Sequence, residues 1–247
     1  MKRSRLTQIK PVLATVLKPA LLIAAILSLG AVCSAQPGKG EVVVSPNENY
    51  RGKDYSEWSA KALKTSLELP LEGHPALDTN PNFDASYGQR GSVWFLGGPF
   101  GTVERTVTIP ANKALFFILL NAECSSLEPP ESGFHGDTET EQAECAKFYS
   151  DHIVNSFFVV DNEPVQNLGD FRFVSPQIEF DAPTPWLFGD TGGHGTSVAD
   201  GYYVMLRPLK KGEHTIHFGG SFHFAAGELG PDPVDLLLDT TYHVTVE

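Results

Sequence analysis

The 247-residue sequence is poor in cysteine, in basic residues and in long apolar runs. It contains three Cys, and its 18 Lys and Arg are outnumbered by 30 Asp and Glu, which gives a formal net charge of −12. Proteins that bind nucleic acid need a basic surface, so this charge argues against that class of partner. Phosphate loops, dinucleotide-binding turns, nucleophile elbows and His-Glu-x-x-His helices are also missing. The sequence therefore carries no motif of these common enzyme classes.

The first 35 residues have the pattern of a secretory signal peptide. Five basic residues accompany an apolar run at residues 20–32, which is too short to span a bilayer, and Cys33-Ser34-Ala35 supplies the small residues that signal peptidase recognises. We expect cleavage after Ala35 and a secreted or periplasmic protein with no stable membrane insertion. The remaining 212 residues suffice for one domain and would carry a formal charge of −17.

Two cysteines would remain after that cleavage, Cys124 and Cys145. In an oxidising compartment a single remaining pair is most simply explained as one disulfide. We therefore expect Cys124 and Cys145 to be bonded, and a cysteine nucleophile is the weaker alternative.

The hydrophobic pattern predicts a mainly β fold with two short helices. Capping boxes at Asp54 and Thr138 predict helices that run to about Leu69 and Asp151. Short apolar or alternating segments predict about nine strands, at residues 93–97, 103–109, 114–120, 153–160, 171–174, 177–180, 202–207, 214–224 and 240–246. We expect residues 36–49 to form a linker or edge strand. Residues 50–247 are expected to form a single antiparallel β-sandwich domain of jelly-roll or immunoglobulin-like type.

Several short motifs resemble a family of uncharacterised exported bacterial proteins. They lie at residues 55–60 (YSEWSA), 93–98 (VWFLGG), 121–124 (NAEC), 200–204 (DGYYV) and 212–218 (GEHTIHF). The resemblance covers most of the chain after residue 35 and implies export. That family has no established activity, so the resemblance implies no mechanism.

Three residues are candidates for catalysis: Glu123, His135 and His194. Glu123 directly follows the apolar segment at residues 114–120 and adjoins Cys124, so its carboxylate should be partly buried and in need of a partner. His135 lies in a long loop after this segment, and His194 lies in a glycine-rich segment that we expect to be a flexible loop. A carboxylate beside a histidine can activate water, if the two loops meet. The alternative is that charged residues merely solvate long loops.

Ligand-binding candidates come from the same regions of the sequence. Asn121, Asp190 and Asp200 offer oxygen atoms that suit calcium or a polar ligand. Trp94 could form an aromatic surface that binds sugars together with Phe100 and Trp186, although a tryptophan within an apolar strand is more often part of the core.

Strand alternation places three histidines on one face of a sheet. In the segment at residues 214–224 the even positions are apolar, so His217 and His223 share the opposite face, and His243 has the same position in the last strand. If these two strands pair, the three imidazoles could bind zinc or copper. The alternative is a solvated, histidine-rich face.

Two functions remain open at this point. The first is a soluble, exported binding or interaction protein of the cell envelope or exterior, with a small molecule or an extracellular polymer such as a glycan as its ligand. The second is a secreted hydrolase that acts on ester, lactone or glycosidic bonds through carboxylate and histidine, with calcium or zinc as a candidate cofactor. The absence of catalytic motifs favours the first.

Overall fold

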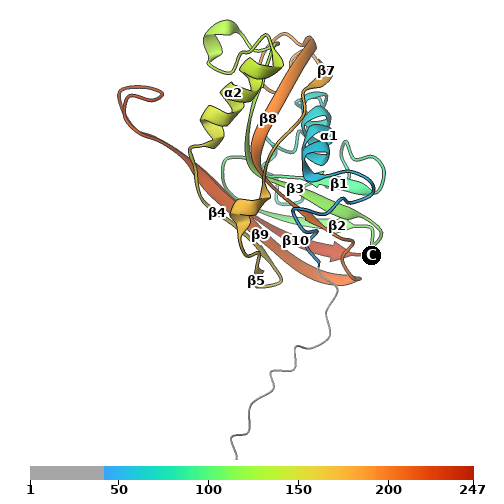
Figure 1. Cartoon of the computed structure of the whole chain (residues 1–247). Helices are drawn as coiled ribbons and strands as arrows, with labels where there is room; N and C mark the ends of the chain where they lie inside the picture. The colour runs from blue at the N-terminus through green and yellow to red at the C-terminus, as the bar shows by residue number, and fades with distance from the viewer. Residues whose placement is uncertain (1–41) are drawn as a thin grey trace, which may run out of the picture. The chain divides into compact units, whose positions relative to one another are not determined.

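The computed structural model describes residues 42–247 (Figure 1). The predicted signal peptide and residues 36–41 of the predicted linker lie outside the described residues. Residues 42–49 of that linker are described, and within them Val43 forms an isolated antiparallel bridge with Leu206. Among the described helices, none has both the length and the apolar character needed to cross a membrane.

Ten strands form two sheets, and this confirms the predicted mainly β, two-layered architecture. The first sheet contains β1 (Val93–Leu96), β3 (Ala114–Ser125), β8 (Gly193–Leu206) and β6 (Arg172–Val174) in that order, with β7 (Ile178–Ala182) also paired to β8. The second contains β2 (Gly101–Ile109), β10 (Val234–Val246), β9 (Gly212–Phe224), β4 (Ile153–Val160) and β5 (Glu163–Pro164) in that order. β1 with β3 and β2 with β10 are parallel pairs, so both sheets are mixed rather than purely antiparallel.

Aromatic side chains from both sheets pack together in the main core. Phe117 of β3 contacts the rings of Phe158, Phe218 and Tyr242, which belong to three strands of the second sheet. These rings are almost completely buried. Because burial of large apolar side chains is the main source of stability, this contact holds the two layers face to face.

Two helices cover the first sheet, and both begin as predicted. α1 (Tyr55–Leu67) starts at the capping box of Asp54 and Glu57, and α2 (Glu139–Ser150) starts at that of Thr138 and Glu141. Figure 1 shows the two helices on opposite sides of β8. Short 3₁₀ turns, η1 (Pro130–Ser132) and η2 (Leu168–Phe171), complete the elements.

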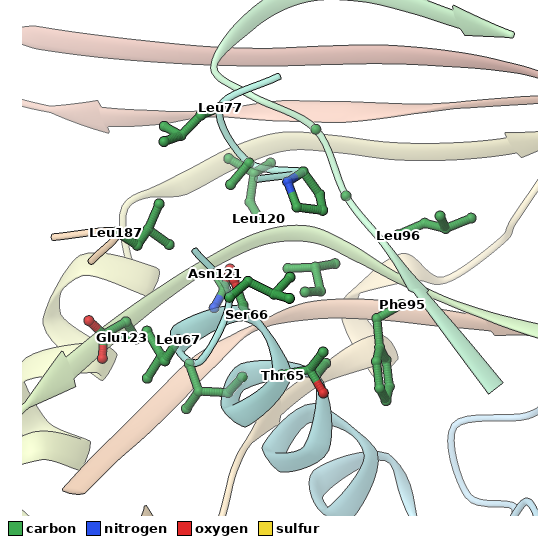
Figure 2. Close-up of a pocket in the computed structure, with 18 of the residues that line it drawn as sticks. Thr65, Ser66, Leu67, Leu77, Phe95, Leu96, Leu120, Asn121, Glu123 and Leu187 are labelled. Carbon is green, nitrogen blue, oxygen red and sulfur yellow. The ribbon is translucent and has the colours of Figure 1, made fainter. Parts of the chain in front are cut away.

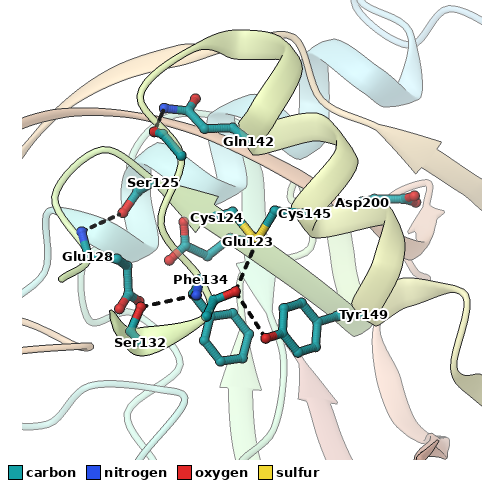
Figure 3. The surroundings of a disulfide bond; sticks show 12 residues. Glu123, Cys124, Ser125, Glu128, Ser132, Phe134, Gln142, Cys145, Tyr149 and Asp200 are labelled. Atoms are coloured by element: carbon teal, nitrogen blue, oxygen red, sulfur yellow. Dashed lines mark hydrogen bonds between the residues drawn. A yellow bond between two sulfur atoms is a disulfide. The ribbon is translucent and has the colours of Figure 1, made fainter. Parts of the chain in front are cut away.

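The predicted disulfide is present and joins β3 to α2. The Cα atoms of Cys124 and Cys145 lie 6.1 Å apart (Figure 3). Just beyond the disulfide, the ring of Phe134 stacks on Tyr149 of α2 at 4.1 Å, and the Tyr149 hydroxyl donates to the carbonyl of Gly133. The loop after β3 is therefore fixed against this helix.

Three strands are at least five residues longer than the sequence predicts; one is β10, which begins at Val234 rather than at residue 240, and the others are β3 and β8. β3 continues to Ser125 and β8 begins at Gly193, so the expected glycine-rich loop around His194 is wrong. The second half of β3 and the first half of β8 contain glycine and polar residues, and they pair with each other. Asn121, for example, pairs with Gly201. Gly201 permits that pairing, because a Cβ there would lie 2.4 Å from the carbonyl oxygen of Leu120. Backbone pairing thus forms a strand where the side-chain pattern alone indicates a loop.

A bulge in β3 determines which residues face the site. The register with β8 shifts between Ile118 and Leu120, so one residue of β3 is extra. Alternation therefore changes phase at the bulge, and Asn121 and Glu123 lie on the sheet face opposite to that of Phe117. β1 pairs with β3 only at residues 114–117. Beyond Phe117, the edge of β3 that does not pair with β8 is therefore no longer covered by β1.

The segment between α1 and β1, residues 68–92, contains no helix or strand in the described chain and is called the rim loop below. Arg105 of β2, which is fully buried, holds this loop to the second sheet. Its guanidinium donates to the carbonyls of Pro75, at 2.8 Å, and of Asp78. It also donates to the Tyr242 hydroxyl at 2.7 Å.

Candidate functional site

Two adjoining pockets lie along β3 in the stretch beyond its pairing with β1. Their volumes are about 300 Å³ and about 230 Å³. The larger pocket is lined by α1, the rim loop and β3 (Figure 2), and the smaller by β3, α2 and parts of β9 and β10. Five residues line both pockets: Phe100, Asn121, Glu123, Phe188 and Phe222. We therefore describe the pair as one site with two compartments.

Apolar side chains form most of the wall of this site. The smaller compartment contains six aromatic residues: Phe100, Phe134, Tyr149, Phe188, Phe222 and Phe224. Phe100 is 59% exposed, and Leu77 and Phe188 at the same site are exposed as well. Exposed large apolar side chains that gather around a cavity are typical of a binding site for an apolar ligand.

Glu123 is the carboxyl group common to both compartments. Its side chain comes from the rigid strand β3 and is only 7% exposed. Oε1 has no hydrogen-bond partner, while Oε2 is hydrogen-bonded to the hydroxyl of Ser197 on β8. Burial raises the pKa of Glu123 to about 8; the contact with Ser197 opposes this rise and the nearby Glu128 adds to it. At neutral pH Glu123 is therefore mostly an uncharged carboxylic acid.

The contacts of Ser197 indicate where the proton of Glu123 lies. The Ser197 hydroxyl is also 3.0 Å from the carbonyl oxygen of Cys124, which can only accept a hydrogen bond. If Ser197 donates its one proton to Cys124, the neutral Glu123 donates from Oε2 to Ser197. This chain satisfies every member except Oε1, which is left as a bare carbonyl-type acceptor at the pocket wall. An unpaired buried acceptor costs about 1–3 kcal/mol, and a ligand that donates a hydrogen bond would recover part of that cost.

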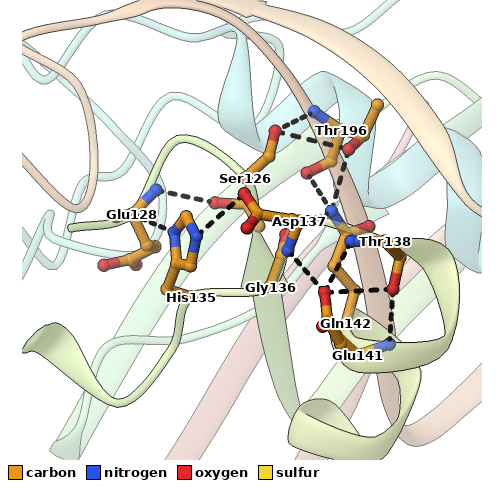
Figure 4. Close-up of polar contacts among 10 residues, drawn as sticks. Ser126, Glu128, His135, Gly136, Asp137, Thr138, Glu141, Gln142 and Thr196 are labelled. Carbon is orange, nitrogen blue, oxygen red and sulfur yellow. Dashed lines mark hydrogen bonds and ion pairs between the residues drawn. The ribbon is translucent and has the colours of Figure 1, made fainter. Parts of the chain in front are cut away.

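Glu128 is a second carboxyl group in the smaller compartment, on the loop that follows β3. It is buried, and burial raises its pKa as well. Its backbone carbonyl accepts a hydrogen bond from Nδ1 of His135 at 2.5 Å, while Nε2 of His135 lies 3.1 Å from Asp137 (Figure 4). Both ring nitrogens of His135 are thus engaged in fixing this loop.

The three candidate catalytic residues do not meet in one pocket. Glu123 lines both compartments, but neither His135 nor His194 lines either of them. His135 lies behind Glu128, and His194 is an exposed residue of β8 whose Nδ1 is 3.1 Å from Asp181 of β7. Of these three residues, only Glu123 lines the candidate site, and the two histidines contact other residues.

Of the four predicted ligand-binding residues, Asn121 lines both compartments. Asp200 is buried and forms a two-point ion pair with Arg172, at 2.9 Å and 2.7 Å. Asp190 is an exposed residue that does not line the site. Trp94 is 8% exposed in the main core and Trp186 is 2% exposed in a second cluster, so they do not form an aromatic surface with Phe100.

The three predicted metal-binding histidines belong to paired strands, as expected, but each contacts a different carboxylate. His217 lies 2.7 Å from Asp239, His223 lies 2.7 Å from Asp235, and His243 lies 3.5 Å from Glu104. His223 is six positions from His217 along β9, which separates their side chains by about 20 Å. In the part of the chain that is described, no group of three or more His, Cys, Asp or Glu side chains is arranged to hold a metal ion.

Sequence reasoning missed Ser197, Glu128 and the aromatic wall. Ser197 belongs to a segment that looks like a loop, and its role depends on pairing with β3. Phe100 lies alone between Pro99 and Gly101, and Phe188 ends a short Trp-Leu-Phe run before Gly189, so neither belongs to a periodic apolar pattern. Phe100 was expected in an aromatic surface with Trp94 and Trp186, but its place beside Phe188 and Glu123 was not predicted.

The chain matches no protein-family model, no curated protein and no solved structure. The resemblance to exported bacterial proteins therefore stays a prediction, and the pocket around Glu123 is the basis for assigning a function.

Proposed function

We propose that this protein is an exported binding protein for a small, mainly apolar molecule that carries a hydrogen-bond donor. The observation that carries the proposal is the unpaired Oε1 of Glu123 at the wall of an apolar cavity. A cavity of about 300 Å³ with few polar groups is typical of sites that enclose small ligands. The disulfide between Cys124 and Cys145 supports an oxidising, extracytoplasmic location.

A glycan is a poorer candidate than an apolar ligand. Each sugar hydroxyl that loses water needs a hydrogen-bond partner, and burial without one costs free energy. The polar side chains that line the site are outnumbered by apolar ones; they are Thr65, Ser66, Tyr87, Gln89, Asn121, Glu123, Glu128 and Tyr149. Trp94 and Trp186 are buried and line neither compartment. A ligand with an apolar body and one polar group needs only one hydrogen-bond partner, and it would supply the donor that Oε1 of Glu123 lacks.

Binding of the neutral fluorescent dye 2-naphthol, an apolar body with one hydroxyl donor, tests this proposal. The chain offers a matched pair of variants on β10: Leu236 lines the smaller compartment, and its neighbour Leu237 does not. Both are exposed, at 38% and 48%. Leu236→Ser should weaken dye binding several-fold while Leu237→Ser leaves it unchanged. Equal effects of the two substitutions, or no saturable binding, would contradict the proposal.

A hydrolase that uses Glu123 as a general acid is the second candidate. The observation in its favour is the raised pKa of Glu123, which keeps a proton on a buried carboxyl group at neutral pH. Turnover of a short p-nitrophenyl ester that is lost in Glu123→Gln would support hydrolysis. Binding of 2-naphthol without turnover of such esters would favour the binding protein.

A further inference from the structure

We infer that the site selects a hydrophobic amine, bound as its ammonium ion with the nitrogen at Glu123 and the apolar body among the aromatic rings. This inference rests on the proposed function and specifies the chemical class of the ligand. It follows from three features of the site: the sign of its charges, its aromatic rings and the unpaired oxygen of Glu123.

The charges at the site are of one sign. Glu123 and Glu128 are the two carboxyl groups that line it, and among the described residues no Lys, Arg or His side chain lines either compartment. A carboxylate ligand would meet two buried acidic groups and no cation, which is unfavourable at short range in a medium of low dielectric constant. A neutral or cationic donor meets no such repulsion. The excess of acidic residues over the whole chain also favours the approach of cations.

Aromatic rings add a second preference for a cation. The smaller compartment contains six of them together with Glu123 and Glu128. The face of an aromatic ring attracts an ammonium group, and the attraction is stronger where water is excluded. A neutral alcohol of the same size gains nothing from this attraction between a cation and an aromatic ring.

The free Oε1 of Glu123 supplies the hydrogen-bond acceptor that an ammonium group needs. When the ammonium approaches, the carboxyl group gives up its proton to solvent, Ser197 turns its hydroxyl toward the resulting carboxylate, and the ion pair replaces the neutral acid. One proton leaves, one cation enters, and the charge of the complex is unchanged. Because Glu123 is neutral in the free protein and its pKa is about 8, ionising it at pH 7 weakens amine binding by about 10-fold, and the ion pair must more than offset this.

Other titratable groups at the site are Glu128, Tyr87 and Tyr149, and His135 lies behind Glu128. Burial raises the pKa values of Glu128 and Tyr149. Tyr149 is uncharged at pH 7 because its pKa is raised further above its ordinary value, so Glu128 is the group whose charge most affects Glu123. Its substitution should therefore weaken the preference for amines without abolishing it.

Calorimetry with octylamine, octanol and octanoate tests the inference at pH 7 and 0.15 M salt, where surface charges are screened. Octylamine should bind at least about 10-fold more tightly than octanol, the equivalent of about 1.4 kcal/mol, and octanoate should bind most weakly. Repeating the octylamine titration in two buffers of different ionisation enthalpy should reveal release of close to one proton per amine bound. This measurement uses the unmodified protein and needs no variant.

Glu123→Gln should abolish the proton release and reduce the preference for octylamine over octanol several-fold while keeping octanol binding, because the amide oxygen still accepts a hydrogen bond. Glu163→Gln, on the exposed strand β5 away from the site, is the matched control and should change neither. Equal binding of octylamine and octanol without proton release would overturn the inference and leave the proposed function standing. Failure of all three probes to bind would instead overturn the proposed function.

Discussion

Replacing Glu123 with glutamine should change how the stability of the protein depends on pH. Burial raises the pKa of Glu123 from 4.5 to about 8 in the folded protein, whereas in the unfolded chain it titrates at its ordinary value. Between these two values the unfolded state binds fewer protons, so the free energy of unfolding falls as pH rises. The loss should be about 1 kcal/mol at pH 5 and about 3 kcal/mol at pH 7, and should approach completion above pH 8. Glutamine does not titrate, so Glu123→Gln should escape this loss.

Urea unfolding followed by tryptophan fluorescence at pH 5, 6, 7 and 8 measures the effect. The difference in unfolding free energy between Glu123→Gln and the unsubstituted protein should grow by about 2 kcal/mol from pH 5 to pH 7 in favour of the variant. Glu163→Gln, which alters an exposed carboxylate, should run parallel to the unsubstituted protein. If the Glu123→Gln curve is also parallel, then Glu123 is charged in the folded state and the proposed proton chain through Ser197 is wrong.

Three further predictions concern the scaffold around the site. Replacing both Cys124 and Cys145 with serine should lower the unfolding free energy by about 2–4 kcal/mol, and a reducing agent should then no longer lower the melting temperature in a thermal melt. Arg105→Met removes the hydrogen bonds that hold the rim loop, so amide hydrogen exchange at residues 76–78 should become faster than in the unsubstituted protein, and unchanged protection would refute this role. Asp200→Asn weakens the two-point contact with Arg172 and should cost about 1–3 kcal/mol in urea unfolding, a cost that an exposed substitution such as Asp190→Asn should not reproduce.

Local signals in the sequence were sufficient for the parts of this fold that depend on neighbouring residues. Asp54 with Glu57, and Thr138 with Glu141, act over one helical turn, and both helices begin where these pairs predict. The disulfide needed only the count of cysteines and the expected compartment. Glu123 was predicted to be a buried carboxylate from the apolar segment before it, and its burial is confirmed.

Features that depend on partners distant in sequence were not predictable in this way. The second half of β3 and the first half of β8 contain glycine and polar residues, and they become strands because each supplies the backbone partners of the other. The bulge near Leu119 reverses the alternation that a continuous apolar segment suggests. The alternation of apolar residues did place His217 and His223 on one face of β9. It carries no information on how far apart the two rings lie or on which carboxylate contacts each of them.

The buried Arg105 has a consequence for the energetics of ligand binding. A stretch of 25 residues without helix or strand would ordinarily sample many conformations, and a ligand that ordered it would lose affinity to conformational entropy. Here the guanidinium fixes the backbone at Pro75 and Asp78, so the wall formed by residues 75–77 exists before any ligand arrives. The site is preorganised on this side: its affinity is not reduced by ordering of the loop, and association need not wait for loop closure.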